Sequence, residues 1–161
     1  MADAAGADEA TGAGQRDRIT IVIADDHVVV RRGLQMVLDA EPDFEVVGQA
    51  GDIAAARRCV LEQRPDVLVA DLNMPGQTTL DAIPKLRADA PATQIVVLTM
   101  QAEPRYAREA RHAGALGYVL KDAAETELVT AVRLAAAGEA YLNRGLAARL
   151  VVERTRNSNW D

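Results

Sequence analysis

The sequence has few aromatic residues and a single cysteine, and each shortage excludes a class of protein. Phe, Trp and Tyr together make up 3% of the 161 residues, although nearly half of the residues are apolar and many of these are alanine. This composition favours helices packed closely on a Val/Ile/Leu-rich sheet and disfavours an aromatic-rich binding module. Cys59 is the one cysteine, so an intramolecular disulfide is excluded, which fits a reducing, cytoplasmic setting.

The sequence also lacks long apolar runs and clusters of basic residues. No apolar run is long enough to cross a bilayer, so we expect no membrane span. The net charge is −6, whereas nucleic-acid binding needs clustered Lys and Arg to neutralise phosphates, so we expect no direct nucleic-acid partner. Residues 1–17 have neither the basic start nor the apolar core of a signal peptide and are predicted to be a disordered tail.

Short apolar runs alternate with helical patterns from Ile19 onward. The runs cover residues 19–24, 44–50, 66–70, 94–98 and 116–120. At least three of them lack polar alternation, which is typical of parallel strands covered on both faces. Five strands alternating with five helices predict an open, doubly wound parallel α/β sheet.

Several residues mark the expected helix ends, and one conflicts with its helix. The expected N-terminal signals are Asp52, Thr78 or Thr79, Pro104 in a first turn, and a capping box formed by Asp122 and Glu125. The expected C-terminal signals are Gly114 and Gly138. Pro84 lies inside the third helical pattern and is expected to kink that helix or delay its start.

Carboxylates follow two of the predicted strands. Asp25 and Asp26 come after the first run, and Asp71 comes after the third. In open α/β sheets, sites form at the carboxyl ends of strands where the strand order reverses, so these side chains converge if the two strands are neighbours. Three unpaired anions would repel one another, whereas Mg²⁺ binds carboxylates and water through oxygen. The sequence therefore predicts a magnesium site.

Two further strand ends carry complementary groups. Thr99 supplies a hydroxyl after the fourth run, and Lys121 supplies an ammonium group after the fifth. An acidic cluster, a hydroxyl and a lysine around one crevice suit phosphoryl transfer to a carboxylate. Asp71 would attack, and Thr99 and Lys121 would hold the product.

Four motifs make residues 18–140 resemble the receiver domain of two-component response regulators. They are "ADDH", "VLVADLNMPG", "VVLTM" and "GALGYVLKD", each at the expected strand end. The resemblance implies a flavodoxin-like fold with strand order 2-1-3-4-5. It also implies that a sensor histidine kinase phosphorylates Asp71.

The resemblance assigns roles to the other site residues. The metal ligands it implies are Asp26, Asp71 and the Asn73 backbone carbonyl, with Asp25 acting mainly through water. Lys121 would contact the phosphoryl group, and Thr99 and Tyr118 would form a switch pair. This chain departs from the family in the loop after "MPG". The family commonly has any residue, then Asp or Asn, then Gly there, whereas this chain has Gln77, Thr78 and Thr79. Because that glycine is missing, the loop beside Asp71 is expected to differ in shape.

The segment "LTMQAEPRYAREARHAGALGYVLKDAAETELVTAVRLAAAGEAYL" resembles NarL/FixJ-type receivers. Their usual partners are LuxR-type helix-turn-helix domains, so residues 141–161 are expected to be a linker toward an effector domain outside this chain. Leu146, Leu150 and Val151 are expected to form one face of a short extra helix in it. The alternative is a stand-alone receiver that acts by protein–protein contact.

The expected output is a change of surface upon phosphorylation. Thr99 would be drawn toward the phosphoryl group and Tyr118 would turn inward. The surface of the fourth helix, fifth strand and fifth helix would then change. Exposed Ala and Val positions within residues 124–137 are expected to support a phosphorylation-dependent homodimer.

Two other functions are weighed against this one. A phosphatase of the haloacid dehalogenase type also uses an Asp nucleophile and Mg²⁺. Phosphatases of this type have a second Asp two residues after the nucleophile, whereas this chain has Asn73 at that position. A flavin-binding module needs a Ser-, Thr- or Gly-rich phosphate loop after the first strand, where this chain has "DDHVVV".

Overall fold

The computed structural model describes residues 18–160, with side chains as far as residue 152. The strands are β1 (Ile19–Ala24), β2 (Phe44–Ala50), β3 (Val67–Asp71), β4 (Gln94–Thr99), β5 (Gly117–Leu120) and β6 (Tyr141–Leu142). The helices are α2 (Val28–Asp39), α3 (Ile53–Gln63), α4 (Thr79–Asp89), α5 (Pro104–Ala113), α6 (Ala124–Ala136) and α7 (Arg144–Trp160), with a 3-10 turn η1 (Lys121–Ala123) before α6. The tail predicted for residues 1–17 lies outside the described residues.

All neighbouring strands run parallel, in the order β2-β1-β3-β4-β5-β6. The predicted doubly wound sheet and the order of its first five strands are therefore confirmed. The sixth strand is an addition, because Tyr141 and Leu142 pair with Gly117 and Tyr118 at the edge of the sheet. Two residues are too few to produce a recognisable apolar run.

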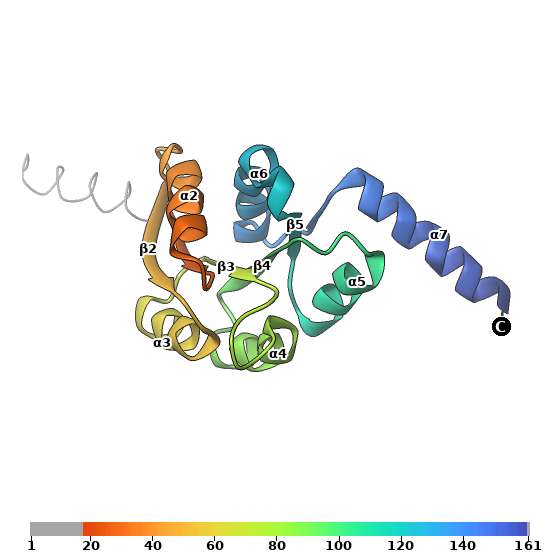
Figure 1. Ribbon diagram of the computed structural model, residues 1–161, viewed down its shortest axis with the longest axis horizontal. Helices are drawn as coiled ribbons and strands as arrows, with labels where there is room; N and C mark the ends of the chain where they lie inside the picture. Colours follow the sequence, from red (N-terminus) through yellow and green to blue (C-terminus); the bar gives the residue numbers. More distant parts are fainter. Residues whose placement is uncertain (1–17, 161) are drawn as a thin grey trace, which may run out of the picture.

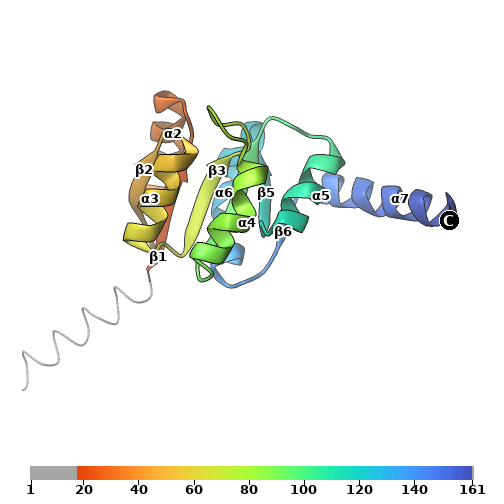
Figure 2. The same cartoon turned by 90° about the horizontal axis from the view of Figure 1, so that it is seen from below.

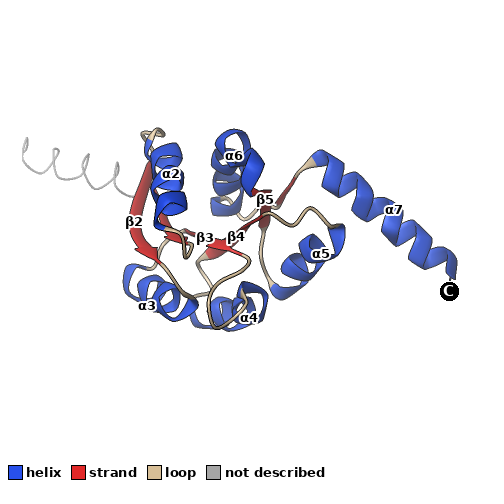
Figure 3. Cartoon of the chain, viewed as in Figure 1, coloured by secondary structure: helices blue, strands red, loops and turns tan. Residues whose placement is uncertain are grey.

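Helices cover both faces of the sheet, as Figures 1 and 3 show. α2 and α6 pack on one face, and α3, α4 and α5 pack on the other, where they face the viewer in Figure 2. Every residue of β3 is buried, which explains why its sequence is a continuous apolar run ending in an aspartate.

α6 uses its small side chains to approach the sheet. The buried residues of this helix are Ala124, Leu128, Ala131, Val132 and Ala135, and Val129 and Ala136 are partly buried. The prediction of exposed Ala and Val positions within residues 124–137 was therefore wrong except at Ala137, which is exposed just after the helix. Its exposed side consists mainly of polar residues such as Glu125, Thr126 and Thr130.

Most of the predicted helix ends are confirmed. The Asp52 carboxylate accepts a hydrogen bond from the backbone N–H of Ala55 at 2.7 Å. Thr78, rather than Thr79, is the N-cap of α4. Pro104 is the first residue of α5, and Gly114 ends that helix with a φ of 127°, a conformation that favours glycine.

The expected capping box is wrong, and one of the two effects expected of Pro84 is excluded. Asp122 belongs to η1 and α6 begins at Ala124 without a side-chain cap, so the capping box does not form. Pro84 lies inside α4 and does not delay its start, because the helix already begins five residues earlier.

α7 is longer than the short helix expected from the sequence. Its first turn is capped by the Asn143 side chain, which accepts from Gly145 N at 2.9 Å and donates to Glu127 of α6 at 3.2 Å. Leu146 is buried and Leu150 packs on the same core, but Val151 is 64% exposed, so the predicted face was wrong at this residue. α7 then extends away from the sheet (Figure 1). Neither α7 nor any other helix within residues 18–160 has the length and apolarity to cross a membrane.

Candidate functional site

The carboxyl ends of β1 and β3 bring the predicted carboxylates together. β1 lies between β2 and β3, so the order of strands along the sheet reverses there. Asp25 follows β1 and Asp71 ends β3, and both are buried. Asp25, Asp26, His27 and Asp71 each offer one ligand atom within 4.8 Å of the others. The convergence expected from the sequence is present, and His27 lies beside it.

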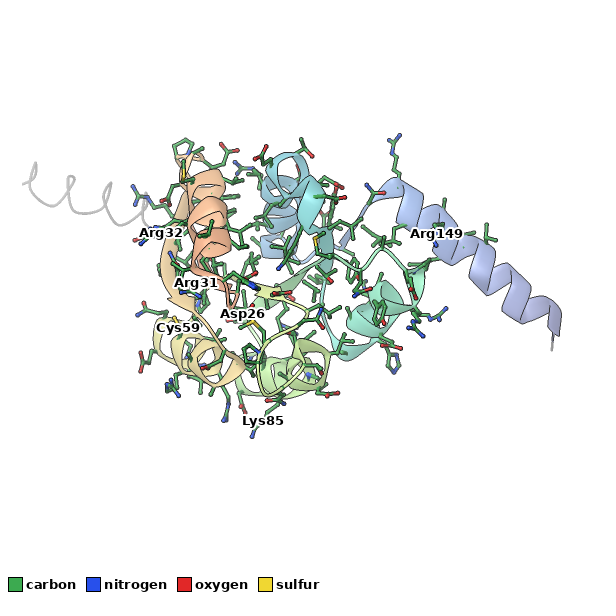
Figure 4. The ribbon with its side chains drawn as sticks, in the orientation of Figure 1. Asp26, Arg31, Arg32, Cys59, Lys85 and Arg149 are labelled. Carbon is green, nitrogen blue, oxygen red and sulfur yellow. The ribbon has the colours of Figure 1, made fainter. Side chains whose placement is uncertain are left out.

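Asp25 is held from several sides, whereas Asp26 is more open. The Asp25 backbone N–H donates to the carbonyl of Ala50 at 3.0 Å, and its own carbonyl accepts from the guanidinium of Arg31. Its carboxylate accepts from His27 N at 2.8 Å. The Asp26 side chain is 30% exposed and lies 2.9 Å from His27 Nδ1. Figure 4 labels Asp26 and Arg31 near the N-terminal end of α2, where Asp26 remains accessible to a ligand.

Lys121 places one positive charge between two buried carboxylates. Its Nζ lies 3.0 Å from Asp71 Oδ2 and 3.1 Å from Asp25 Oδ2. The contact with Asp71 is a hydrogen bond, whereas the contact with Asp25 is an ion pair without hydrogen-bond alignment. The predicted lysine therefore reaches the carboxylates of both strand ends.

Burial and pairing act in opposite directions on these charges. Burial raises the pKa of Asp71, and the hydrogen bond from Lys121 only partly offsets this effect. Burial alone would lower the pKa of Lys121, but its pairing with the carboxylates of Asp71 and Asp25 outweighs this effect and raises that pKa. Lys121 is therefore a cation across the physiological pH range, and it faces more negative charge than it can neutralise.

The loop after β3 is fixed by Thr79. This residue is fully buried, and its hydroxyl donates to the backbone carbonyl of Asp71. The Asp71 carboxylate accepts from Asn73 N at 3.2 Å. Gly76 supplies the positive φ of 82° that the turn requires. Thr79 was considered as a helix cap and as part of a departure in the loop, but the sequence carries no local signal for its role in anchoring that loop.

Thr99 and Tyr118 meet through the loop that follows β4. Thr99 is fully buried, and its Oγ1 accepts from Gln101 N at 3.0 Å. The Tyr118 hydroxyl donates to the Gln101 carbonyl at 2.7 Å. Burial raises the pKa of Tyr118 to about 12, although the Thr99 hydroxyl acts in the opposite direction. The Tyr118 side chain points inward in this structure, since the residue is only 3% exposed. Gln101 acts through its backbone, which explains why its identity gave no signal.

The donor set suits a hard divalent cation. Three of its four residues supply carboxylate oxygens, which Mg²⁺ prefers as ligands, and the fourth, His27, supplies a ring nitrogen. The buried oxygen Asp25 Oδ2 has no hydrogen bond within the described residues, and its charge is opposed by the Lys121 ammonium at 3.1 Å. The acidic cluster of this domain can therefore bind a metal ion.

Comparisons with known proteins show the family of this chain. A model of the response regulator receiver domain matches residues 21–133. The oxygen regulatory protein NreC of Staphylococcus aureus is 44% identical over 142 residues, which cover 88% of this chain and 65% of NreC. The crystal structure of a LuxR-family two-component response regulator from Aurantimonas sp. SI85-9A1 has a TM-score of 0.81 at 33% identity, covering 86% of this chain and 99% of that one.

A third relative is the isolated receiver domain of RcsB from Salmonella enterica serovar Typhimurium, solved with the phosphomimetic BeF₃⁻. It has a TM-score of 0.75 at 28% identity, over 81% of this chain and 97% of that chain.

The fold and the acidic cluster define a flavodoxin-like α/β signalling domain with an acidic site at its topological switch point. The chain belongs to the response regulator receiver family, and its relatives are NarL/LuxR-type regulators. Receivers of this kind are phosphorylation-dependent switches in the control of transcription. The chain spans about two thirds of the length of NreC, 65% of it.

Proposed function

We propose that Asp71 accepts a phosphoryl group from a sensor histidine kinase, in a reaction that requires Mg²⁺. The observation that supports this most directly is the position of Lys121 Nζ, within 3.1 Å of buried carboxylates from two strand ends. A lysine at this position pairs with the carboxylates before phosphorylation and can bind a phosphoryl oxygen after the transfer. Asp26, Asp71 and the Asn73 backbone carbonyl would hold the metal, and Asp25 would act mainly through water.

The chemistry is a displacement at phosphorus. One carboxylate oxygen of Asp71 attacks the phosphorus atom, and the bond from phosphorus to the donor's imidazole nitrogen breaks, with the electron pair leaving on that nitrogen. Lys121 and the hydroxyl of Thr99 hold the oxygens of the transferred group. Bound Mg²⁺ would neutralise part of the charge on those oxygens. The product is an acyl phosphate on Asp71.

The phosphorylated domain would be a signal rather than a step in turnover. A phosphatase with the same nucleophile needs a general acid two residues after it, and an Asn side chain at position 73 cannot give up a proton. We therefore propose that, beyond accepting a phosphoryl group from the kinase, the domain by itself carries out at most self-phosphorylation from small donors and slow self-dephosphorylation. The flavin-binding alternative has no support in the site, because the loop after β1 presents carboxylates.

The output would be transcriptional. The relatives include LuxR-family regulators, and this chain covers 65% of NreC, so we propose that a helix-turn-helix domain beyond α7 binds DNA and that the receiver itself does not. The kinase and a second receiver are the partners of this chain, and the setting is the cytoplasm. The domain organisation proposed is a receiver over residues 18–140 and a linker over 141–161. A stand-alone receiver is the second candidate.

The test is phosphorylation of the whole chain by acetyl phosphate, followed by intact-mass measurement. Wild type is expected to gain one phosphoryl group when Mg²⁺ is present and none when the metal is chelated. Asp71→Asn is expected to gain none, whereas the control Asp122→Asn, which removes an exposed carboxylate next to Lys121, is expected to behave like wild type. Equal phosphorylation of wild type and Asp71→Asn would overturn the proposal.

A further inference from the structure

The loop between β4 and α5 is held by residues from three different elements. Thr99 at the end of β4 accepts a hydrogen bond from Gln101 N at 3.0 Å. Tyr118 in β5 donates to the Gln101 carbonyl at 2.7 Å. Arg149 in α7 donates to the neighbouring carbonyl, that of Ala102, at 3.2 Å. The C-terminal helix is therefore attached to the same loop that joins Thr99 to Tyr118.

A cavity beneath α7 supplies a second connection. It has a volume of about 580 Å³ and lies between α5, the strands β5 and β6, and the first half of α7. Tyr118 forms part of its wall, and so do Leu142 and Leu150. Because the cavity leaves room beside the Tyr118 ring, a change in the position of that ring alters the surface on which α7 rests.

α7 has a firm attachment at its start and a polar contact with this loop farther along. Asn143 caps its first turn, and Leu146 is buried in the core. The next attachment on the same side is the bond from Arg149, whose position Figure 4 labels. The helix beyond this point leads away from the sheet (Figures 1 and 2).

We infer that Arg149 is a coupling residue that transmits the state of the Asp71 site to α7. The inference rests on the proposed function, in which a phosphoryl group on Asp71 draws Thr99 inward and favours a buried Tyr118. The loop conformation that buries Tyr118 is the one that Arg149 holds. Phosphorylation and the attachment of α7 therefore favour each other, and the direction of α7 carries the signal out of the domain.

Coupling of this kind is reciprocal. If the phosphorylated site strengthens the contact between Arg149 and the loop, that contact must strengthen binding of a phosphoryl group by the same factor. A single exposed hydrogen bond sets this factor at about two- to tenfold. Loss of the Arg149 side chain is thus expected to weaken binding of a phosphoryl mimic at the Asp71 site.

The test uses the whole chain with Mg²⁺ and beryllofluoride, with amide hydrogen exchange measured by mass spectrometry. In wild type, beryllofluoride is expected to slow exchange both in the loop at residues 100–103 and in α7 at residues 144–152. In Arg149→Ala, the loop is expected to respond while the response of α7 is lost, and the dissociation constant for beryllofluoride is expected to rise about two- to tenfold. Arg144→Ala removes an exposed arginine from the same helix and is expected to match wild type.

The outcomes separate this inference from the proposed function. If the loop of wild type responds and α7 does not, or if α7 responds equally in Arg149→Ala, the coupling role is overturned while the phosphorylation proposal stands. An unchanged beryllofluoride affinity in Arg149→Ala overturns it as well. If neither segment responds and acetyl phosphate adds no mass, the proposed function fails and the coupling role fails with it.

Discussion

Asp25 and Asp26 are neighbours in sequence but differ in environment. Asp25 is fully buried, contacts Lys121, and accepts a hydrogen bond from the backbone of His27. Asp26 is 30% exposed at its side chain and has only His27 beside it among the ion pairs of the described residues. The carboxylate of Asp26 is therefore free to turn toward a cation, whereas that of Asp25 is committed to its protein partners.

This difference predicts unequal effects on magnesium affinity. Asp26→Ala removes a direct ligand and is expected to weaken Mg²⁺ binding by much more than tenfold, whereas Asp25→Ala removes a supporting group and is expected to weaken it by about tenfold. Isothermal titration with MgCl₂ measures both, with Asp122→Ala as the control. Wild-type affinity in both pocket variants would show that the cation binds elsewhere.

At the scale of a single helix, α2 contains a glycine, Gly33, at a position where the structure has room for a side chain. Gly33 lies inside this helix, and no atom lies within 4 Å of the place that a Cβ would occupy. Glycine in a helix interior is less favourable than alanine because it loses more backbone entropy on folding. Nothing in the surrounding packing offsets that cost.

Gly33→Ala is accordingly expected to increase the free energy of unfolding by about 0.5–1 kcal/mol. Urea unfolding followed by circular dichroism measures the change. The matched control is Gly114→Ala, which is expected to destabilise, since Gly114 has a φ of 127° and its Cβ would lie 3.1 Å from Arg87 Cγ. A loss of stability in Gly33→Ala would mean that α2 needs its glycine for another reason.

Two elements are joined by a charged contact around Arg133. This residue of α6 donates to Asp43 and Glu41 in the loop between α2 and β2, and its guanidinium lies 4.7 Å from the centre of the Phe44 ring. The hydrogen bond from Arg133 lowers the pKa of Asp43 below its ordinary value of 3.8. The folded protein therefore holds Asp43 in its ionised form more strongly than the unfolded chain does.

The sign of the resulting pH dependence follows from this lowered pKa. The contact contributes its full stability above the ordinary pKa of 3.8, and the contribution is lost as the pH falls through the lower folded-state value. Wild type is therefore expected to lose stability below about pH 4 more steeply than Asp43→Asn. Chemical unfolding at a series of acidic pH values compares the two. Parallel pH profiles would contradict the role assigned to Asp43.

At the scale of the whole molecule, the output is expected to be a change in self-association. α6 presents polar residues to solvent, so a dimer formed through this helix would depend on polar contacts more than on apolar ones. Beryllofluoride with Mg²⁺ is expected to increase association in sedimentation velocity, and added salt is expected to reverse part of the increase. Duplex DNA is expected to remain unbound in either state, given the net charge of −6. Identical sedimentation with and without the mimic would contradict the switch.

The strands and the pocket could be predicted from the sequence for a physical reason. A parallel strand covered on both faces must be apolar throughout, so the aspartates after β1 and β3 stand out at its end. The bond from Arg149 to Ala102 could not be predicted, because it joins residues 47 positions apart through a backbone carbonyl. The burial of Thr79 likewise depends on where the loop folds rather than on the residues beside it.

The short strand β6 decides what the sheet exposes at one of its edges. An unpaired strand edge offers hydrogen-bonding groups to any other chain and promotes aggregation. Tyr141 and Leu142 cover that side of Gly117 and Tyr118, and at the opposite edge β2 carries the exposed polar residues Glu45 and Gln49. A fragment that ends at residue 140 would leave β5 open and is expected to self-associate regardless of phosphorylation. A fragment that keeps residues 141 and 142 would still cover β5. Association of the shorter fragment would therefore reflect the exposed edge of β5 and not the phosphorylation state of the receiver.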